Sequence, residues 1–146
     1  MEREVIQSVG FRNIKEDGKA VGFQFRVRLP YYRGVFLSQL RPGTLFVDGE
    51  RFDKDQIIWH IKGEDYTWEE MRSDFKTHWA VTETATLKVK KEGGLSQGLH
   101  ELIYGFCFTS SYMPPVMQGA MDPDQECAIF RPEFGKHINQ RWLIIV

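Results

Sequence analysis

The strongest constraint on the fold is a segment in which apolar and polar residues alternate strictly. In residues 21–29 one set of side chains is apolar and the other polar: Phe23, Phe25, Val27 and Leu29 against Gln24, Arg26 and Arg28. Because successive side chains of a strand point to opposite faces, this period predicts a half-buried β-strand. Pro30 ends the strand because it has no N–H to donate. Asp17-Gly18 predicts a tight turn before it, with residues 9–14 as the hairpin partner.

Further segments show the same strand character between turn residues. They are residues 35–40, 45–47, 51–52, 56–62, 78–81, 84–90 and 100–108. Asp48-Gly49 and Gly93-Gly94 supply turns. Thr67 with Glu70 forms a capping-box pattern, which predicts one helix of about two turns at most. We therefore expect an all-β fold: an antiparallel β-sandwich or flattened barrel with at most one or two short helical turns.

The length of 146 residues and an apolar content of 42% predict a single β-sandwich domain over residues 1–146. Residues 110–146 form a loop-rich C-terminal extension in this prediction, because three prolines fall within residues 110–124. The apolar residues at the very end would be costly to leave exposed. We expect residues 131–146 to dock as an extended strand, on this chain or on another subunit.

Charge and composition favour a soluble protein. The net charge is −1 with acids and bases interspersed, so nucleic acid is an unexpected partner. The first residues lack a signal-peptide pattern, and no apolar run reaches about 18 residues, so we expect a cytoplasmic location without a membrane span. Cys107 and Cys127 are too far apart for a CxxC motif and are interpreted as reduced, packed thiols.

Catalytic motifs are missing from the sequence. The four histidines, His60, His78, His100 and His137, follow no spacing typical of metal ligands, so we predict no metal site in this chain. Ser110-Ser111 lacks a nucleophile elbow. For His100 a hydrogen-bonded position at a strand end is the simpler interpretation, since proton transfer would need a pocket partner. We predict no catalytic residue.

Two aromatic segments are the better functional candidates. Tyr31, Tyr32 and Arg33 follow Pro30, and Gly34 tolerates unusual backbone angles, so a loop should display them. Tyr112 and Met113 lie in the proline-rich segment. Tyrosine, methionine and arginine are enriched at interface cores, so these five residues are the predicted partner interface. The alternative is that the tyrosines close the ends of the sandwich.

Several motifs together resemble a known family, in matching order over about residues 20–115. They are residues 29–34 (LPYYRG), 47–50 (VDGE), 66–70 (YTWEE), Trp79, 93–100 (GGLSQGLH) and 111–114 (SYMP). The chain resembles the small beta subunit of bacterial C-glycoside deglycosidases. Pro115 and residues 119–146 match no motif of that family.

The resemblance implies a hetero-oligomeric lyase of carbohydrate metabolism. In such a complex an alpha subunit with a TIM barrel holds a divalent metal, with manganese expected, and the catalytic base. The complex cleaves the carbon–carbon bond between a 3-oxo sugar and an aromatic aglycone such as a flavonoid. The beta subunit implied for this chain is an auxiliary β-sandwich that carries no cofactor and is non-catalytic alone.

Two other functions stay open at this point. One is a stand-alone carbohydrate-binding β-sandwich in which Trp59, Trp68 or Trp79 stacks on sugar rings. The other is a self-sufficient hydrolase that uses His100 and a nearby carboxylate.

Overall fold

The computed structural model describes residues 5–30, 33–41, 43–108 and 136–146. Its strands are β1 (Arg12–Glu16), β2 (Lys19–Arg28), β3 (Val35–Phe36), β4 (Leu40–Arg41), β5 (Leu45–Val47), β6 (Glu50–Phe52), β7 (Ile57–Ile61), β8 (Glu64–Tyr66), β9 (His78–Trp79), β10 (Thr84–Lys90), β11 (Gly98–Phe108) and β12 (Lys136–Ile145). The described helical parts are α1 (Trp68–Arg72) and two 3₁₀ turns, Leu37–Gln39 and Lys54–Gln56. This confirms the predicted all-β class.

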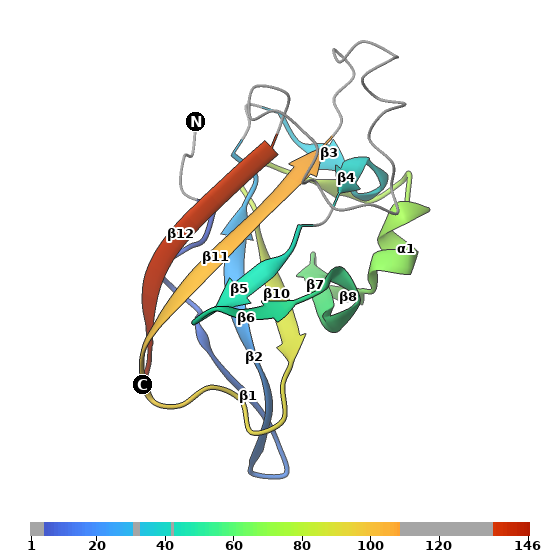
Figure 1. Cartoon of the computed structure of the whole chain (residues 1–146). Coiled ribbons are helices and arrows are strands. Elements are labelled where there is room, and N and C mark those ends of the chain that lie inside the picture. Colours follow the sequence, from blue (N-terminus) through green and yellow to red (C-terminus); the bar gives the residue numbers. More distant parts are fainter. Residues whose placement is uncertain (1–4, 31–32, 42, 109–135) are drawn as a thin grey trace.

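The strands form two antiparallel sheets that lie one behind the other (Figure 1). The first sheet has the order β1-β2-β10-β7-β8. The second has the order β12-β11-β5-β6, with β4 also paired to β11. β3 and β9 form a separate two-stranded ribbon. The described strands therefore make an open sandwich rather than a closed barrel.

The core lies between the sheets and is rich in aromatic rings. The four apolar residues predicted for one face of β2 are fully buried: Phe23, Phe25, Val27 and Leu29. Phe25 contacts Tyr104 of β11 edge to face, with ring centroids 5.8 Å apart. Trp59 of β7 contacts Phe106 of β11 at 6.0 Å. Such ring pairs join the first sheet to the second.

Local sequence signals explain most of the turns. Asp17 and Asp48 adopt positive φ angles of 51°, each followed by a glycine that also has a positive φ, as tight hairpin turns require. The hairpin partner of β2 begins at Arg12, later than the predicted residues 9–14. The capping box of α1 is confirmed: the Thr67 side chain accepts a bond from Glu70 N, and Glu70 Oε1 accepts one from Thr67 N.

The C-terminal strand docks on this chain, which is one of the two arrangements expected from the sequence. β12 pairs with β11 from Gly98↔Ile145 to Cys107↔Lys136. Its side chains also hold the N-terminal segment: Asn139 Oδ1 accepts a bond from Ile6 N at 2.9 Å, and Arg141 donates to Ile6 O at 2.9 Å. The two ends of the chain thus close one side of the sandwich.

The described helix α1 is far too short to cross a membrane, and no membrane-spanning helix is found among the described residues.

Replacing Phe106 tests the aromatic core. Phe106 is fully buried and contacts Trp59, Trp79 and Tyr104. We expect Phe106→Ala to lower the free energy of unfolding by about 3–5 kcal/mol, because it removes a large ring and leaves a cavity. Urea denaturation measures this value. Phe75→Ala, at a ring that is 72% exposed, is the control and should cost less than about 0.5 kcal/mol. Equal losses in both variants would contradict this account of the core.

Candidate functional site

The segment after β2 is the first part of the candidate site. β2 ends at Arg28, as predicted from Pro30, and Arg33 is exposed in the chain that leads to β3. Tyr31, Tyr32, Tyr112 and Met113 lie outside the described residues. Arg33 is therefore the one predicted interface residue whose position the structure gives, and the interface assignment stays a prediction.

Gly34 is required for a reason that differs from the expectation. Its backbone does not take a positive φ. Instead, a Cβ at this position would lie 2.2 Å from His78 Cε1 and 2.6 Å from Trp79 O. Gly34 thus lets the chain pass close against β9, where Val35 pairs with Trp79 and Phe36 with His78.

Phe36 and His78 form a partly exposed ring pair on this ribbon. Their centroids are 5.3 Å apart in an edge-to-face arrangement, and Phe36 is 42% exposed. Gln39 Oε1 accepts a bond from Phe36 N at 2.8 Å, which fixes the backbone next to the ring. The pair is therefore held in place while its outer side stays open to solvent.

A tight turn beside the ribbon exposes a second phenylalanine. The Asp74 carboxylate accepts bonds from Lys76 N and Thr77 N at 2.9 and 2.7 Å, and Asp74 O accepts one from Ser38 N. Burial raises the pKa of the Asp74 carboxyl, but the bonds from Thr77 and Lys76 lower it more, so the pKa lies below its ordinary value. Phe75 lies within this turn and is 72% exposed.

A shallow depression of about 500 Å³ lies beside Phe75, between α1 and this turn. Tyr66, Glu70 and residues 73–77 line it. We call Arg33, Phe36, Phe75 and His78 the aromatic end of the molecule. Of these four residues, only Arg33 was predicted from the sequence as an interface residue. Phe75 had one usable signal, a lone phenylalanine between the polar residues Asp74 and Lys76.

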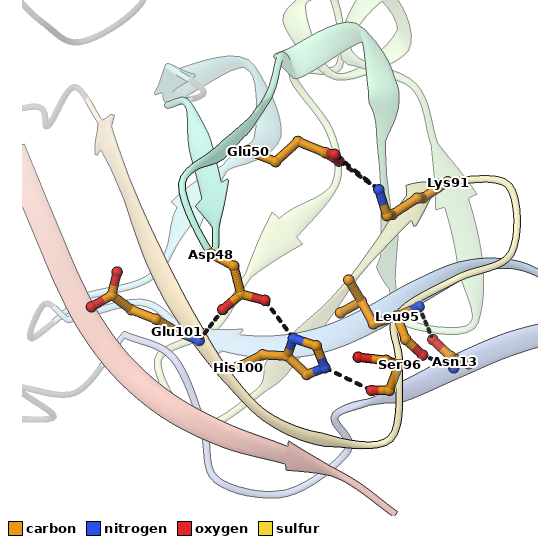
Figure 2. A network of polar contacts seen from close by, with 8 residues as sticks. All are labelled: Asn13, Asp48, Glu50, Lys91, Leu95, Ser96, His100 and Glu101. Atoms are coloured by element: carbon orange, nitrogen blue, oxygen red, sulfur yellow. Dashed lines mark hydrogen bonds and ion pairs between the residues drawn. The ribbon is translucent and has the colours of Figure 1, made fainter.

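His100 belongs to a different part of the sandwich, shown in Figure 2. It is 6% exposed, and its Nδ1 lies 2.5 Å from Asp48 Oδ2 while its Nε2 lies 2.7 Å from the Ser96 carbonyl oxygen. Asp48 Oδ1 also accepts a bond from Glu101 N at 2.9 Å. Nearby, the Asn13 side chain makes two bonds to the Leu95 backbone. This network fastens the loop that precedes β11.

The two ring nitrogens of His100 face a carboxylate oxygen and a carbonyl oxygen, both of which accept hydrogen bonds, so this geometry favours the doubly protonated ring. Burial lowers the pKa of His100, but the bonds to Asp48 and Ser96 and the charge of Asp48 raise it above its ordinary value. The bond from His100 lowers the pKa of Asp48 more than desolvation raises it. With both nitrogens occupied, His100 is the hydrogen-bonded residue at a strand start that the simpler interpretation predicted. The arrangement gives no support to a hydrolase built on His100.

The tryptophans named for sugar stacking are not available for it. Trp59, Trp68 and Trp79 are 2%, 4% and 0% exposed. The burial of all three side chains therefore gives no support to the alternative in which one of them stacks on a sugar ring. For Trp59 the cause is the alternation along β7, which turns its face to the core.

Metal ligands do not converge anywhere in the described part of the chain. No group of three His, Cys, Asp or Glu side chains comes together there. His60 instead lies 2.7 Å from Asp65, which Lys88 also contacts at 3.1 Å.

The contribution of the His100–Asp48 pair to the free energy of unfolding should depend on pH. The pKa of His100 is raised above 6.5 by folding, so its contribution is complete below pH 6.5 and is lost as the pH rises through the raised value. The pKa of Asp48 is lowered below 3.8, so its contribution is complete above pH 3.8 and is lost as the pH falls through the lowered value. The loss of unfolding free energy in His100→Gln should therefore shrink above pH 6.5.

Denaturant unfolding of the wild type and His100→Gln across pH 5–9 measures this difference. In an Asp48→Asn background the same comparison should depend less on pH, because the charged partner is gone. A difference that stays constant or grows toward high pH would contradict the protonated state assigned to His100.

Comparison with known proteins adds to this geometry. A sequence model described as the C-glycoside deglycosidase beta subunit matches residues 1–112. A C-glycoside deglycosidase beta subunit of Eubacterium cellulosolvens is 67% identical over 147 aligned residues, covering 100% of both chains. A 3'-dehydrocarminate deglycosidase beta subunit of a Microbacterium species is 30% identical over 95 residues, 64% of this chain and 70% of that one. The chain therefore belongs to the C-glycoside deglycosidase beta subunit family.

Proposed function

We propose that this chain is an accessory subunit that binds a catalytic alpha subunit through its aromatic end. The observation that carries the proposal is two exposed rings, Phe36 and Phe75, on segments joined by backbone bonds, in a chain whose relatives are named beta subunits. A beta subunit needs a surface for another subunit, and exposed aromatic rings with an arginine are typical of the centre of such a surface.

The construction of the aromatic end supports this role. Leu37 N bonds to Thr77 O and Ser38 N to Asp74 O, so the segment after Phe36 and the turn that contains Phe75 are fastened together. Backbone segments held in this way lose little conformational freedom when a partner covers them. The Arg33 guanidinium adds a group able to bind a carboxylate of the partner with two parallel bonds.

The proposed reaction takes place in the alpha subunit, a TIM barrel with a divalent metal, for which manganese is the proposed ion. One relative is named for a 3'-dehydro substrate, which fits a sugar with a ketone at C3. That ketone acidifies the C2 proton, and a divalent metal held by the alpha subunit would polarise its oxygen. A base removes the C2 proton, the resulting electron pair forms the C1–C2 double bond, and the bond from C1 to the aromatic carbon breaks. The aromatic carbon then takes up a proton, so the aglycone leaves intact.

Variants of the aromatic end, and of Tyr32 next to Arg33 in the sequence, test the docking role. Arg33→Ala, Tyr32→Ala and Phe75→Ala should each leave the isolated chain folded. Each should weaken binding of the alpha subunit by about tenfold or more, which corresponds to roughly 1.4 kcal/mol. Isothermal calorimetry with the purified alpha subunit measures the affinity. Lys19→Ala, at an exposed residue of the β1–β2 hairpin, is the matched control and should bind as the wild type does. Full affinity and turnover in all three variants would rule out the aromatic end as the surface that binds the alpha subunit.

Metal removal tests whether the metal is held by the alpha subunit rather than by this chain. A chelator should abolish C–C cleavage by the complex, and added manganese should restore it, because the proposed metal polarises the substrate ketone. The same chelator should leave the melting temperature of this chain alone unchanged. A chelator-resistant complex, or a chain that melts earlier in chelator, would contradict the proposed location of the metal.

A further inference from the structure

The loop between β10 and β11, residues 91–97, is held to both sheets by polar side chains (Figure 2). On the side of the first sheet, the Asn13 side chain accepts a bond from Leu95 N and donates one to Leu95 O, both at 2.8 Å. On the side of the second sheet, His100 Nε2 lies 2.7 Å from Ser96 O. In the described part of the chain, Ser96 has no other hydrogen bond to a residue outside this loop. The end of the loop therefore depends on His100.

The two bonds of the His100 ring require two protons. Its Nδ1 lies 2.5 Å from Asp48 Oδ2, and its Nε2 faces the Ser96 carbonyl oxygen. A neutral imidazole has a single N–H, so it can keep one of these bonds and must give up the other. A bond to a carboxylate is stronger than one to a neutral carbonyl, and a proton on Nε2 would leave the Nδ1 lone pair against the charge of Asp48. The bond to Asp48 is therefore the one that survives.

The surroundings of the ring leave Asp48 as the charged group in contact with it. On its other sides His100 meets apolar side chains: the Phe11 ring lies edge to face with centroids 6.2 Å apart, and Leu143 is the strand partner in β12. The other charged side chains of the network are bonded elsewhere, Glu101 to Gln140 and Glu50 to Lys91. The protonation of His100 is therefore coupled to Asp48 above all.

We propose that His100 is a pH-sensitive latch on the loop between β10 and β11. In the doubly protonated form the ring bonds to both Asp48 and Ser96, and the end of the loop is closed. When one proton is lost to solvent, the remaining proton stays on Nδ1 and the bond to Ser96 O breaks. The end of the loop then opens while the sandwich stays folded, because the ring contacts of the core do not titrate.

The direction of the switch follows from the contacts of the ring. Burial lowers the pKa of His100, but the bonds to Asp48 and Ser96 raise it more. The loop is therefore closed below pH 6.5 and opens as the pH rises through the raised value. In Figure 1 the start of β11 lies at the end of the sandwich opposite α1 and the β3–β9 ribbon. The latch thus does not depend on the docking role proposed for the aromatic end.

Nitrogen-15 NMR of the imidazole rings in the full chain tests which bond breaks. Between about pH 5.5 and 9 the His100 ring should change from doubly protonated to a neutral tautomer with its proton on Nδ1. A neutral ring that keeps its proton on Nε2 overturns the proposal. So does a ring with one protonation state throughout this range.

Hydrogen exchange at the Leu95 amide measures the opening of the loop, because this amide bonds to Asn13 and lies next to Ser96. Exchange is corrected for its intrinsic dependence on pH and compared with the amides of β2, which report global unfolding. The protection of Leu95 relative to β2 should fall roughly fivefold as the pH rises, which is the effect of one lost hydrogen bond. A ratio that is constant from about pH 5.5 to 9 contradicts the latch.

Asp48→Asn is the diagnostic variant. Its amide N–H can donate to a deprotonated Nδ1, so the neutral ring keeps its proton on Nε2 and its bond to Ser96 O. The protection ratio should then be independent of pH, and His100→Gln, which should also lose the dependence, decides the test if Asp48→Asn does not fold. His60→Gln is the matched control, because it removes another histidine that contacts an aspartate, Asp65 at 2.7 Å. A dependence that survives in a folded Asp48→Asn or His100→Gln chain, or that disappears in His60→Gln, overturns the proposal.

Discussion

Edge-to-face packing of aromatic rings between the two sheets is the interaction on which the rest of the structure depends. Trp59 of β7 contacts Trp79 of β9 at 5.6 Å and Phe106 of β11 at 6.0 Å, so one group of rings joins three separate strand systems. This packing also positions the candidate site. Trp79 is fully buried, and its neighbour in sequence, His78, lies on the outside against Phe36. The core therefore fixes the surface that we propose for docking.

The features that were predictable from sequence are local ones. Alternation identified the buried faces of β2 and β11, and Asp17-Gly18 and Asp48-Gly49 identified the hairpins, because a strand face or a tight turn is specified by adjacent residues. The pairing of strands was not predictable in this way. Beyond the β1–β2 hairpin, β2 pairs with β10, and β11 pairs with β12 and β5, through contacts between residues far apart in sequence. The separate β3–β9 ribbon follows from such contacts and breaks what had looked like one strand over residues 35–40.

The contacts of the candidate site and of His100 were also not predictable from local sequence. Asp48 and His100 are 52 positions apart, and only the pairing of β5 with β11 brings the turn that holds Asp48 to the start of β11. Gly34 seemed to need unusual backbone angles, whereas it is needed because β9 passes close to it. Phe75 became visible as a site residue only once its exposure was known. In Figure 1 the β3–β9 ribbon and α1 lie at the end of the sandwich opposite the C-terminus.

Hydrogen–deuterium exchange of this chain, alone and bound to the alpha subunit, tests the central claim most directly. The claim is that the beta subunit binds the catalytic subunit through its aromatic end. It predicts that residues 33–38 and 74–78 exchange more slowly in the complex, while the β1–β2 hairpin exchanges at the same rate in both states. Unchanged exchange in residues 33–38 and 74–78, with new protection only elsewhere, would contradict it.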